Sequence, residues 1–141
     1  MVSYLDKNIE CSFVQTFIQK RIQERIIWEL ASVKKRKTAI WRFCHTTDDI
    51  VKPQLVLIKS NKLTNSIILQ SVSELTTLTS CYIISFYEEI DGKQMTITNA
   101  VSHCIGRGLP SIIIIGEQVA IIETEQSIGA SIKYILHAVL Q

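Results

Sequence analysis

The side chains best suited to chemistry are four adjacent cations in the stretch ASVKKRKTAIWRF, residues 31–43. They are Lys34, Lys35, Arg36 and Lys37, and no acidic residue in that stretch neutralises them. A lysine-rich loop after a helix is one explanation, because cations stabilise the negative end of a helix. That role needs only one or two cations, whereas four repel one another. The run therefore favours contact with the phosphate backbone of a nucleic acid.

The distribution of charge along the chain favours the same interpretation. Residues 1–42 contain nine Lys and Arg and four Asp and Glu, whereas residues 43–141 contain six and nine. No aromatic ladder or base-reading motif accompanies the run, so we expect electrostatic binding with little sequence specificity. Four phosphate contacts predict a log–log salt slope of about −3 to −4. Additional basic contacts could come from Lys20, Arg21, Arg25 and Arg42.

Carboxylates form two further groups, Asp48 with Asp49, and Glu88 and Glu89 with Asp91. Paired acids can bind a divalent ion or act as general acid and base. A small α/β metal-dependent hydrolase or nuclease is therefore the alternative function. Such clusters are more often solvated turns, and a third possibility is a structural scaffold whose lysine run is only solvated.

Neighbouring cysteine and histidine residues occur at Cys44–His45 and at His103–Cys104. Adjacent residues point to opposite faces of a strand, or lie about 100° apart on a helix, so neither pair suits activation of a nucleophile. No two ligands have the spacing of a zinc site. We therefore expect no catalytic residue, no metal and no cofactor, and a chain that is not an enzyme.

The elements that must position the cationic run begin with an apolar stripe between Ser12 and Lys34. Its spacing of three and four residues predicts one helix, roughly 34 Å long. Such a helix is longer than one small sheet needs, so part of its apolar face should pair with a second copy of the chain. The expected dimer contacts are Phe13, Phe17, Ile22 and Ile26.

The rest of the chain alternates between strand and helix patterns. We predict strands at 38–44, 54–59, 81–90, 111–116 and 118–124, helices at 60–80, 94–110 and 125–141, and a polar loop at 45–53. The continuous apolar run at 111–116 indicates burial on both faces of a sheet. This order predicts one α/β domain, residues 1–141, with a mixed sheet flanked by helices and a long N-terminal helix.

The composition of the chain favours a soluble, intracellular protein. Hydrophobic residues make up 47% of the 141 residues, yet no apolar run approaches the roughly 20 residues that span a bilayer. The first residues lack the apolar region of a signal peptide. The four cysteines are widely spaced, so we expect buried, reduced thiols and not two disulfides. We predict a cytoplasmic location and no membrane partner.

Residues 53–123 resemble the anticodon-binding domain of histidyl-type class II aminoacyl-tRNA synthetases. The resemblance rests on KPQLVLIKSN, on LTSCYIISFYEE and on DGKQMTITNAVSHCIGRGLPSIIIIGEQ. In the last segment a helix leads through Gly108 and Pro110 into an apolar strand followed by Gly116. The chain departs from a synthetase because it lacks a catalytic domain.

With its N-terminal additions the chain is similar to the C-terminal domain of the general-control kinase of translation initiation factor 2-alpha, a sensor of amino-acid starvation. That resemblance implies a non-catalytic regulatory module of a serine/threonine kinase, active in translation regulation and the integrated stress response. It implies homodimerisation, binding to ribosomes, rRNA and tRNA, and restraint or activation of the kinase domain. By position, the RNA- and ribosome-binding residues would be Lys34, Lys35, Arg36 and Lys37.

Overall fold

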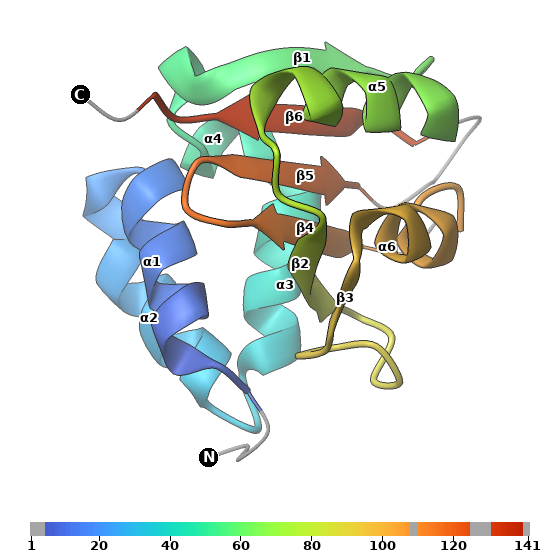
Figure 1. The fold of residues 1–141 in the computed structure, drawn as a ribbon. Coiled ribbons are helices and arrows are strands. Elements are labelled where there is room, and N and C mark those ends of the chain that lie inside the picture. The colour runs from blue at the N-terminus through green and yellow to red at the C-terminus, as the bar shows by residue number, and fades with distance from the viewer. Residues whose placement is uncertain (1–4, 108–109, 125–130, 140–141) are drawn as a thin grey trace.

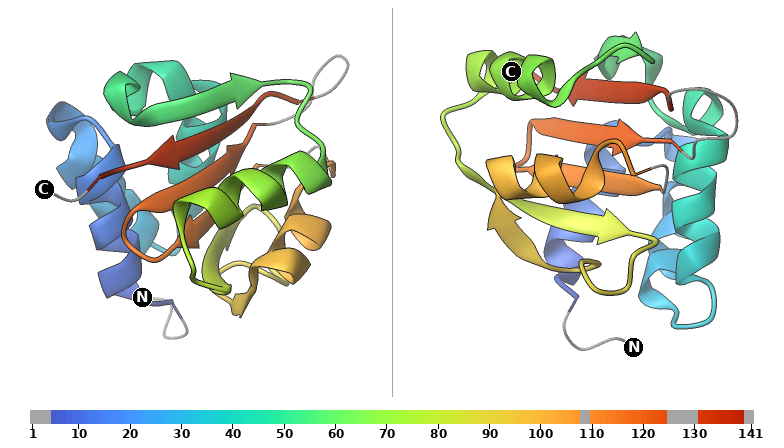
Figure 2. Two further views of the ribbon diagram at one scale, coloured as in Figure 1. Left: turned by 45° about the horizontal axis from the view of Figure 1, so that its top comes forward. Right: turned by 90° about the vertical axis from the view of Figure 1, so that its right-hand side faces the viewer.

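A six-stranded antiparallel sheet separates two layers of helices (Figures 1 and 2). The computed structural model describes residues 5–107, 110–124 and 131–139. The strand order is β1-β6-β5-β4-β2-β3, and every neighbouring pair is antiparallel. The predicted α/β class with flanking helices is confirmed, whereas the predicted mixed sheet is wrong.

The described elements have the following bounds. The helices are α1 (Lys7–Phe17), α2 (Gln23–Ala31), α3 (Arg36–His45), α4 (Thr47–Ile50), α5 (Asn65–Leu75) and α6 (Ile97–Cys104), with 3-10 turns at Lys20–Ile22 and Pro53–Leu55. The strands are β1 (Val56–Ser60), β2 (Ser80–Ser85), β3 (Gln94–Thr96), β4 (Ser111–Ile115), β5 (Val119–Glu123) and β6 (Lys133–His137).

The central strands are buried on both faces, as the apolar run at 111–116 predicts. Successive side chains of a strand point to opposite faces. Ile112 and Ile114 accordingly pack with α1 to α4, while Ile113 and Ile115 pack with α5 and α6. Two hydrophobic cores result, one on each face of the sheet.

The predicted long helix between Ser12 and Lys34 is wrong, because the chain turns back at its middle. Helix α1 ends at Phe17, and Ile18 is extended, with φ −98° and ψ 142°. Ile18 forms an antiparallel bridge with Val51, and the Gln23 side chain donates to the Ile18 carbonyl at 2.8 Å. The apolar stripe therefore continues through two short helices that both pack against the same face of the sheet (Figure 1).

Two further predictions are wrong in element type. Residues 38–44, predicted as a strand, lie within α3, whose buried face includes Ala39, Ile40 and Phe43. The polar loop predicted at 45–53 contains the short helix α4. The predicted final helix instead contributes β6, which lies between β1 and β5, while residues 125–130 and 140–141 fall outside the described residues.

The remaining predicted elements are found with shorter or shifted bounds, except that residues 94–96, predicted as part of the helix at 94–110, form strand β3. Helix α5 is capped by Thr64, whose hydroxyl accepts a hydrogen bond from the Ile67 amide at 3.2 Å. Helix α6 is followed by Gly106, whose φ of +84° suits a residue without a Cβ. These two helices cover the second face of the sheet, opposite the helices that carry the cationic run.

Candidate nucleic-acid interface

The cationic run lies at the corner between α2 and α3. Helix α2 ends at Ala31, and the Ser32 carbonyl accepts hydrogen bonds from the amides of Lys35 and Arg36, at 3.2 and 2.9 Å. These bonds close a tight turn from which α3 starts at once. Three of the four cations therefore belong to the amino end of α3 and not to the end of a preceding helix.

Three lysines of the run project into solvent. Lys34, Lys35 and Lys37 are all exposed. The Lys37 ammonium lies 3.0 Å from a carboxylate oxygen of Glu88 and 6.0 Å from the centre of the Phe86 ring. Among the described residues, no carboxylate pairs with Lys34 or Lys35. These three side chains can reach a ligand outside the molecule.

Arg36 does not share that surface, so its prediction as an RNA contact is wrong. Its side chain is buried, with the residue only 5% exposed, because the helical turn directs it inward between two carboxylates. It donates two hydrogen bonds to Asp91, at 2.7 and 2.9 Å, and two to Glu10, at 2.7 and 2.8 Å. A fifth goes to the Leu30 carbonyl at 3.0 Å. All five guanidinium donors are thus used inside the protein.

The charge state of this buried cluster follows from its contacts. Burial alone would lower the pKa of Arg36, but its hydrogen bonds to Asp91 and Glu10 raise it above the ordinary value. The Tyr82 hydroxyl donates to Glu10 at 2.6 Å, and burial followed by this carboxylate raises the pKa of Tyr82. Arg36 therefore remains a cation that joins α1, α3 and the turn after β2.

The other predicted basic contacts differ in their accessibility. Lys20, Arg21 and Arg25 are exposed, although Arg21 donates to the Asp49 carbonyl at 2.8 Å. Arg42 is half-buried and donates to both carboxylate oxygens of Glu29, at 3.0 and 3.2 Å. Glu29 is itself buried, so Arg42 holds α3 against α2 and is a poor candidate for an external ligand.

The side chains expected at a dimer interface belong to the core of one copy. Phe13, Phe17 and Ile26 are buried, and Ile22 packs partly buried against the same cluster. The prediction is wrong for Phe13, Phe17 and Ile26, because the fold-back at Ile18 brings both halves of the stripe onto the chain's own sheet, and for Ile22 it stays a prediction.

An exposed aromatic residue, missed by the sequence analysis, follows the cationic run on α3. Trp41 is 47% exposed, and its ring stacks on that of His45, with centroids 4.3 Å apart and planes 13° apart. The predicted strand at 38–44 contains Trp41 but not Lys37, so it does not place the two side chains on one surface. On a helix the two lie four positions apart and share one face. The helical spacing of Ala39, Ile40 and Phe43 was the available signal.

Two of the carboxylates considered for metal chemistry, Asp48 and Glu88, pair with lysines. The oxygens of Asp48 accept from Lys59 at 2.6 Å and from the Tyr134 hydroxyl at 2.9 Å. The Lys59 hydrogen bond is the main reason that the pKa of Asp48 lies below its usual value. Across the described ranges, no group of three or more His, Cys, Asp and Glu residues is placed to hold a metal ion.

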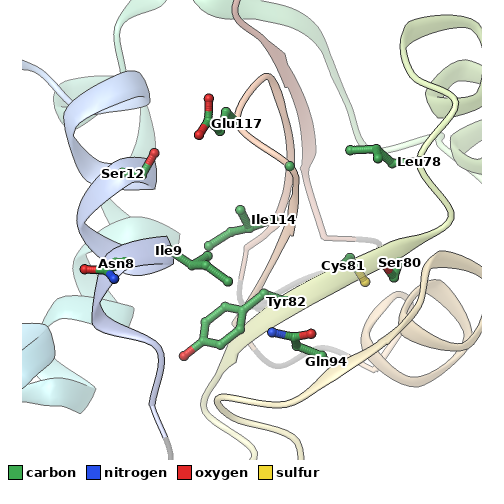
Figure 3. Close-up of a pocket in the computed structure, with 11 residues that line it drawn as sticks. Asn8, Ile9, Ser12, Leu78, Ser80, Cys81, Tyr82, Gln94, Ile114 and Glu117 are labelled. Atoms are coloured by element: carbon green, nitrogen blue, oxygen red, sulfur yellow. The ribbon is translucent and has the colours of Figure 1, made fainter.

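A groove of about 340 Å³ lies between α1 and the start of β2 (Figure 3). Ile9, Leu78 and Ile114 supply apolar surface, and Glu117 is the acid among its lining residues. None of the described residues that line it is Lys, Arg or His. The groove is therefore poorly suited to a phosphate ligand.

Comparison with protein-family models, with curated proteins and with solved structures gave no match. No helix in the described part of the chain combines the length and the apolar character needed to cross a membrane.

Proposed function

We propose that this chain is a non-catalytic module that binds RNA, including ribosomal RNA and tRNA, through Lys34, Lys35 and Lys37. The observation that carries the proposal is the exposure of these three lysines together at the amino end of α3. They form one outward corner of the molecule, which we call the lysine corner. Because RNA presents regularly spaced phosphates, a rigid corner of this kind can contact several of them at once.

The position of the lysine corner is unfavourable for the folded protein itself. The amino end of a helix carries a partial positive charge, and each cation there costs about 0.3–1 kcal/mol. Lys35 is the N-cap residue of α3 and Lys37 lies in its first turn, which contains no acidic residue. Stabilisation of the helix therefore does not account for the lysines, whereas an external anion would be attracted by both the lysines and the helix end.

The resemblance to the general-control kinase supports the wider role that we propose. Residues 53–123 contain β1, α5, β2, β3, α6, β4 and β5, an element order compatible with the strand–helix–strand–helix–strand order that the resemblance implies, although their sheet is antiparallel and not mixed. We propose that the module belongs to a starvation-activated protein kinase and works in the cytoplasm. There it recruits ribosomes and tRNA and restrains or activates the kinase domain.

We also propose that the module forms a homodimer, through the edge of the sheet at β1. Strand β1 ends the strand order, and an edge strand offers unpaired backbone groups to a second chain. Leu57 on β1 and Ile67 on α5, the next helix along the chain, are both exposed. Two copies paired about a two-fold axis would bury these apolar side chains.

The RNA proposal is tested with a triple variant of the lysine corner and a matched control. Lys34→Ala/Lys35→Ala/Lys37→Ala should abolish retention of RNA and of ribosomes while the far-ultraviolet circular dichroism is unchanged. Lys62→Ala/Lys93→Ala/Arg107→Ala removes three exposed cations elsewhere and should retain binding. Three contacts predict a wild-type log–log salt slope of about −2 to −3. Undiminished binding by the folded corner variant at moderate salt would refute the proposal.

The dimer is tested by measuring the mass of the wild-type protein by sedimentation at micromolar concentrations. Leu57→Lys should lower the measured mass to that of a monomer, because a charge would then be buried in the interface. Leu78→Lys is the control, since Leu57 and Leu78 are equally exposed. A wild-type mass that stays monomeric at every concentration contradicts the dimer.

A further inference from the structure

One exposed strip of α3 carries both charge and an aromatic ring. Lys37, Trp41 and His45 are spaced by four residues and are all exposed, so they follow one another along the helix surface. At a rise of about 1.5 Å per residue, Lys37 and Trp41 are separated by about 6 Å along the axis. Lys34 lies in the turn that leads into α3, three residues before Lys37, and Lys35 is the N-cap of the helix.

The ring of Trp41 is held in place although it is exposed. It stacks on His45, and a ring nitrogen of that histidine, Nδ1, lies 3.0 Å from the Trp41 carbonyl oxygen. An indole that is 47% exposed and also oriented by a neighbour is available for stacking by a ligand. A pre-oriented ring loses little conformational freedom when a flat ligand stacks on it.

The chemistry of this strip fits an unpaired segment of RNA better than a duplex. A single strand presents phosphates and the flat faces of its bases together, and bases stack readily on aromatic side chains next to cations. In a duplex the bases are stacked on one another, and a protein reaches mainly phosphates and 2′-hydroxyls. Lysines alone would bind either form, whereas an exposed indole adds affinity only for the unpaired one.

We infer that Trp41 stacks on an unpaired base of an RNA segment whose phosphates are bound by Lys34, Lys35 and Lys37. This inference rests on the proposed RNA-binding function and adds a preference for single-stranded over double-stranded RNA. The stacking is independent of base identity, because every base offers a flat face.

The test compares a short oligouridylate with a blunt RNA duplex of the same length by fluorescence anisotropy. Trp41→Ala should weaken binding of the oligouridylate by about 5- to 150-fold, and leave binding of the duplex unchanged. Trp41→Phe should retain most of the affinity, because it keeps an aromatic face. Trp28→Ala is the matched control, since Trp28 is 61% exposed on α2 and lies outside the strip. A Trp28→Phe protein, whose remaining indole is Trp41, should lose fluorescence when the oligouridylate binds.

Three other outcomes would overturn the inference, and they differ in whether the stacking or the RNA binding itself fails. Equal losses for single strand and duplex, or equal losses for Trp28→Ala and Trp41→Ala, would exclude specific stacking on Trp41. Unchanged binding by Trp41→Ala, with binding lost in the triple lysine variant, would overturn the stacking and leave the proposed function standing. If the wild-type protein binds neither RNA, the proposed function fails first. Circular dichroism of each variant identifies any loss caused by unfolding.

Discussion

Arg36 and Asp91, 55 positions apart in the chain, are joined by two parallel hydrogen bonds of 2.7 and 2.9 Å. Glu10 on α1 accepts two hydrogen bonds from the same guanidinium, so Arg36 connects α1, α3 and the turn after β2. The four adjacent cations thus have two different roles. Its arginine is internal and structural, whereas its three lysines face outward.

The buried position of Arg36 predicts a large loss of stability on its removal. Arg36→Ala would leave Glu10 and Asp91 buried without a cation, which costs about 3–5 kcal/mol of the free energy of unfolding. Lys35→Ala, at the adjacent exposed position, should change it by less than about 0.5 kcal/mol. Urea denaturation of both variants makes the comparison. Similar small losses in the two would show that the cluster is not a structural unit.

The ion pair between Lys37 and Glu88 should compete with RNA. Both side chains are exposed, at 59% and 80%, so the pair contributes at most about 1 kcal/mol. Glu88→Gln would release Lys37 and should strengthen oligouridylate binding, by up to about fivefold. Glu89→Gln removes one negative charge from the next residue. Its expected smaller gain in oligouridylate affinity measures the effect of net charge alone. Equal gains from both substitutions would contradict a specific competition.

The thiols should differ sharply in reactivity. Burial is the main cause that raises the pKa of Cys81 to about 12 and that of Cys104 to about 11. Because the thiolate is the reactive form, both should resist a maleimide in the native protein at neutral pH. Cys11 is only partly buried and should react first. Mass-spectrometric mapping of the labelled sites checks this order, and early labelling of Cys81 would contradict it.

Glu123 should make stability fall as the pH rises. Burial raises its pKa above the usual value of about 4.3, although the Gly106 amide and the Ser131 hydroxyl donate hydrogen bonds to it. Between the usual and the raised pKa the native state holds a proton that the unfolded state has lost. The contribution of Glu123 to the free energy of unfolding is therefore complete at pH values below its pKa in the unfolded state. It disappears as the pH rises through its pKa in the folded state.

Glu123→Gln removes that titration and serves as the reference at each pH. The free energy of unfolding of the wild type, relative to the variant, should decrease across the acid range and then level off. Urea denaturation at a series of pH values measures both proteins under identical conditions. Asp48 titrates in the opposite sense in both proteins and cancels in the difference. A difference that stays constant, or increases with pH, would contradict burial of this carboxylate.

The strands of the central sheet could be predicted because their residues are apolar on both faces. The run from Ile112 to Ile115 suits only a buried strand, and β5 follows it after a short turn. The same rule could have identified β6, where Tyr134, Ile135 and Leu136 are consecutive and buried. The spacing of Ile132, Ile135, Leu136 and Val139 also fits a helix. Pairing of this segment with β1 and β5 in the folded protein favours the strand.

The candidate site was predictable only in its local charge. The three lysines are exposed, and a run of charged residues in the sequence indicates exposure directly. The burial of Arg36 depends on Glu10 and Asp91, which are 26 and 55 positions away, and no local pattern encodes such partners. Trp41 was missed because aromatic and β-branched residues favour strands locally. Packing of α3 against the sheet overrides that preference.

The insertion of β6 between β1 and β5 affects how the protein can be made. A ribosome synthesises β1 long before residues 133–137, so the first strand has no sheet partner until the last strand has been made. Closure of the sheet joins residues more than seventy positions apart, such as Val56 and Leu136, and such distant contacts form slowly. Until β6 pairs with it, β1 would present unpaired backbone groups that another chain could bind.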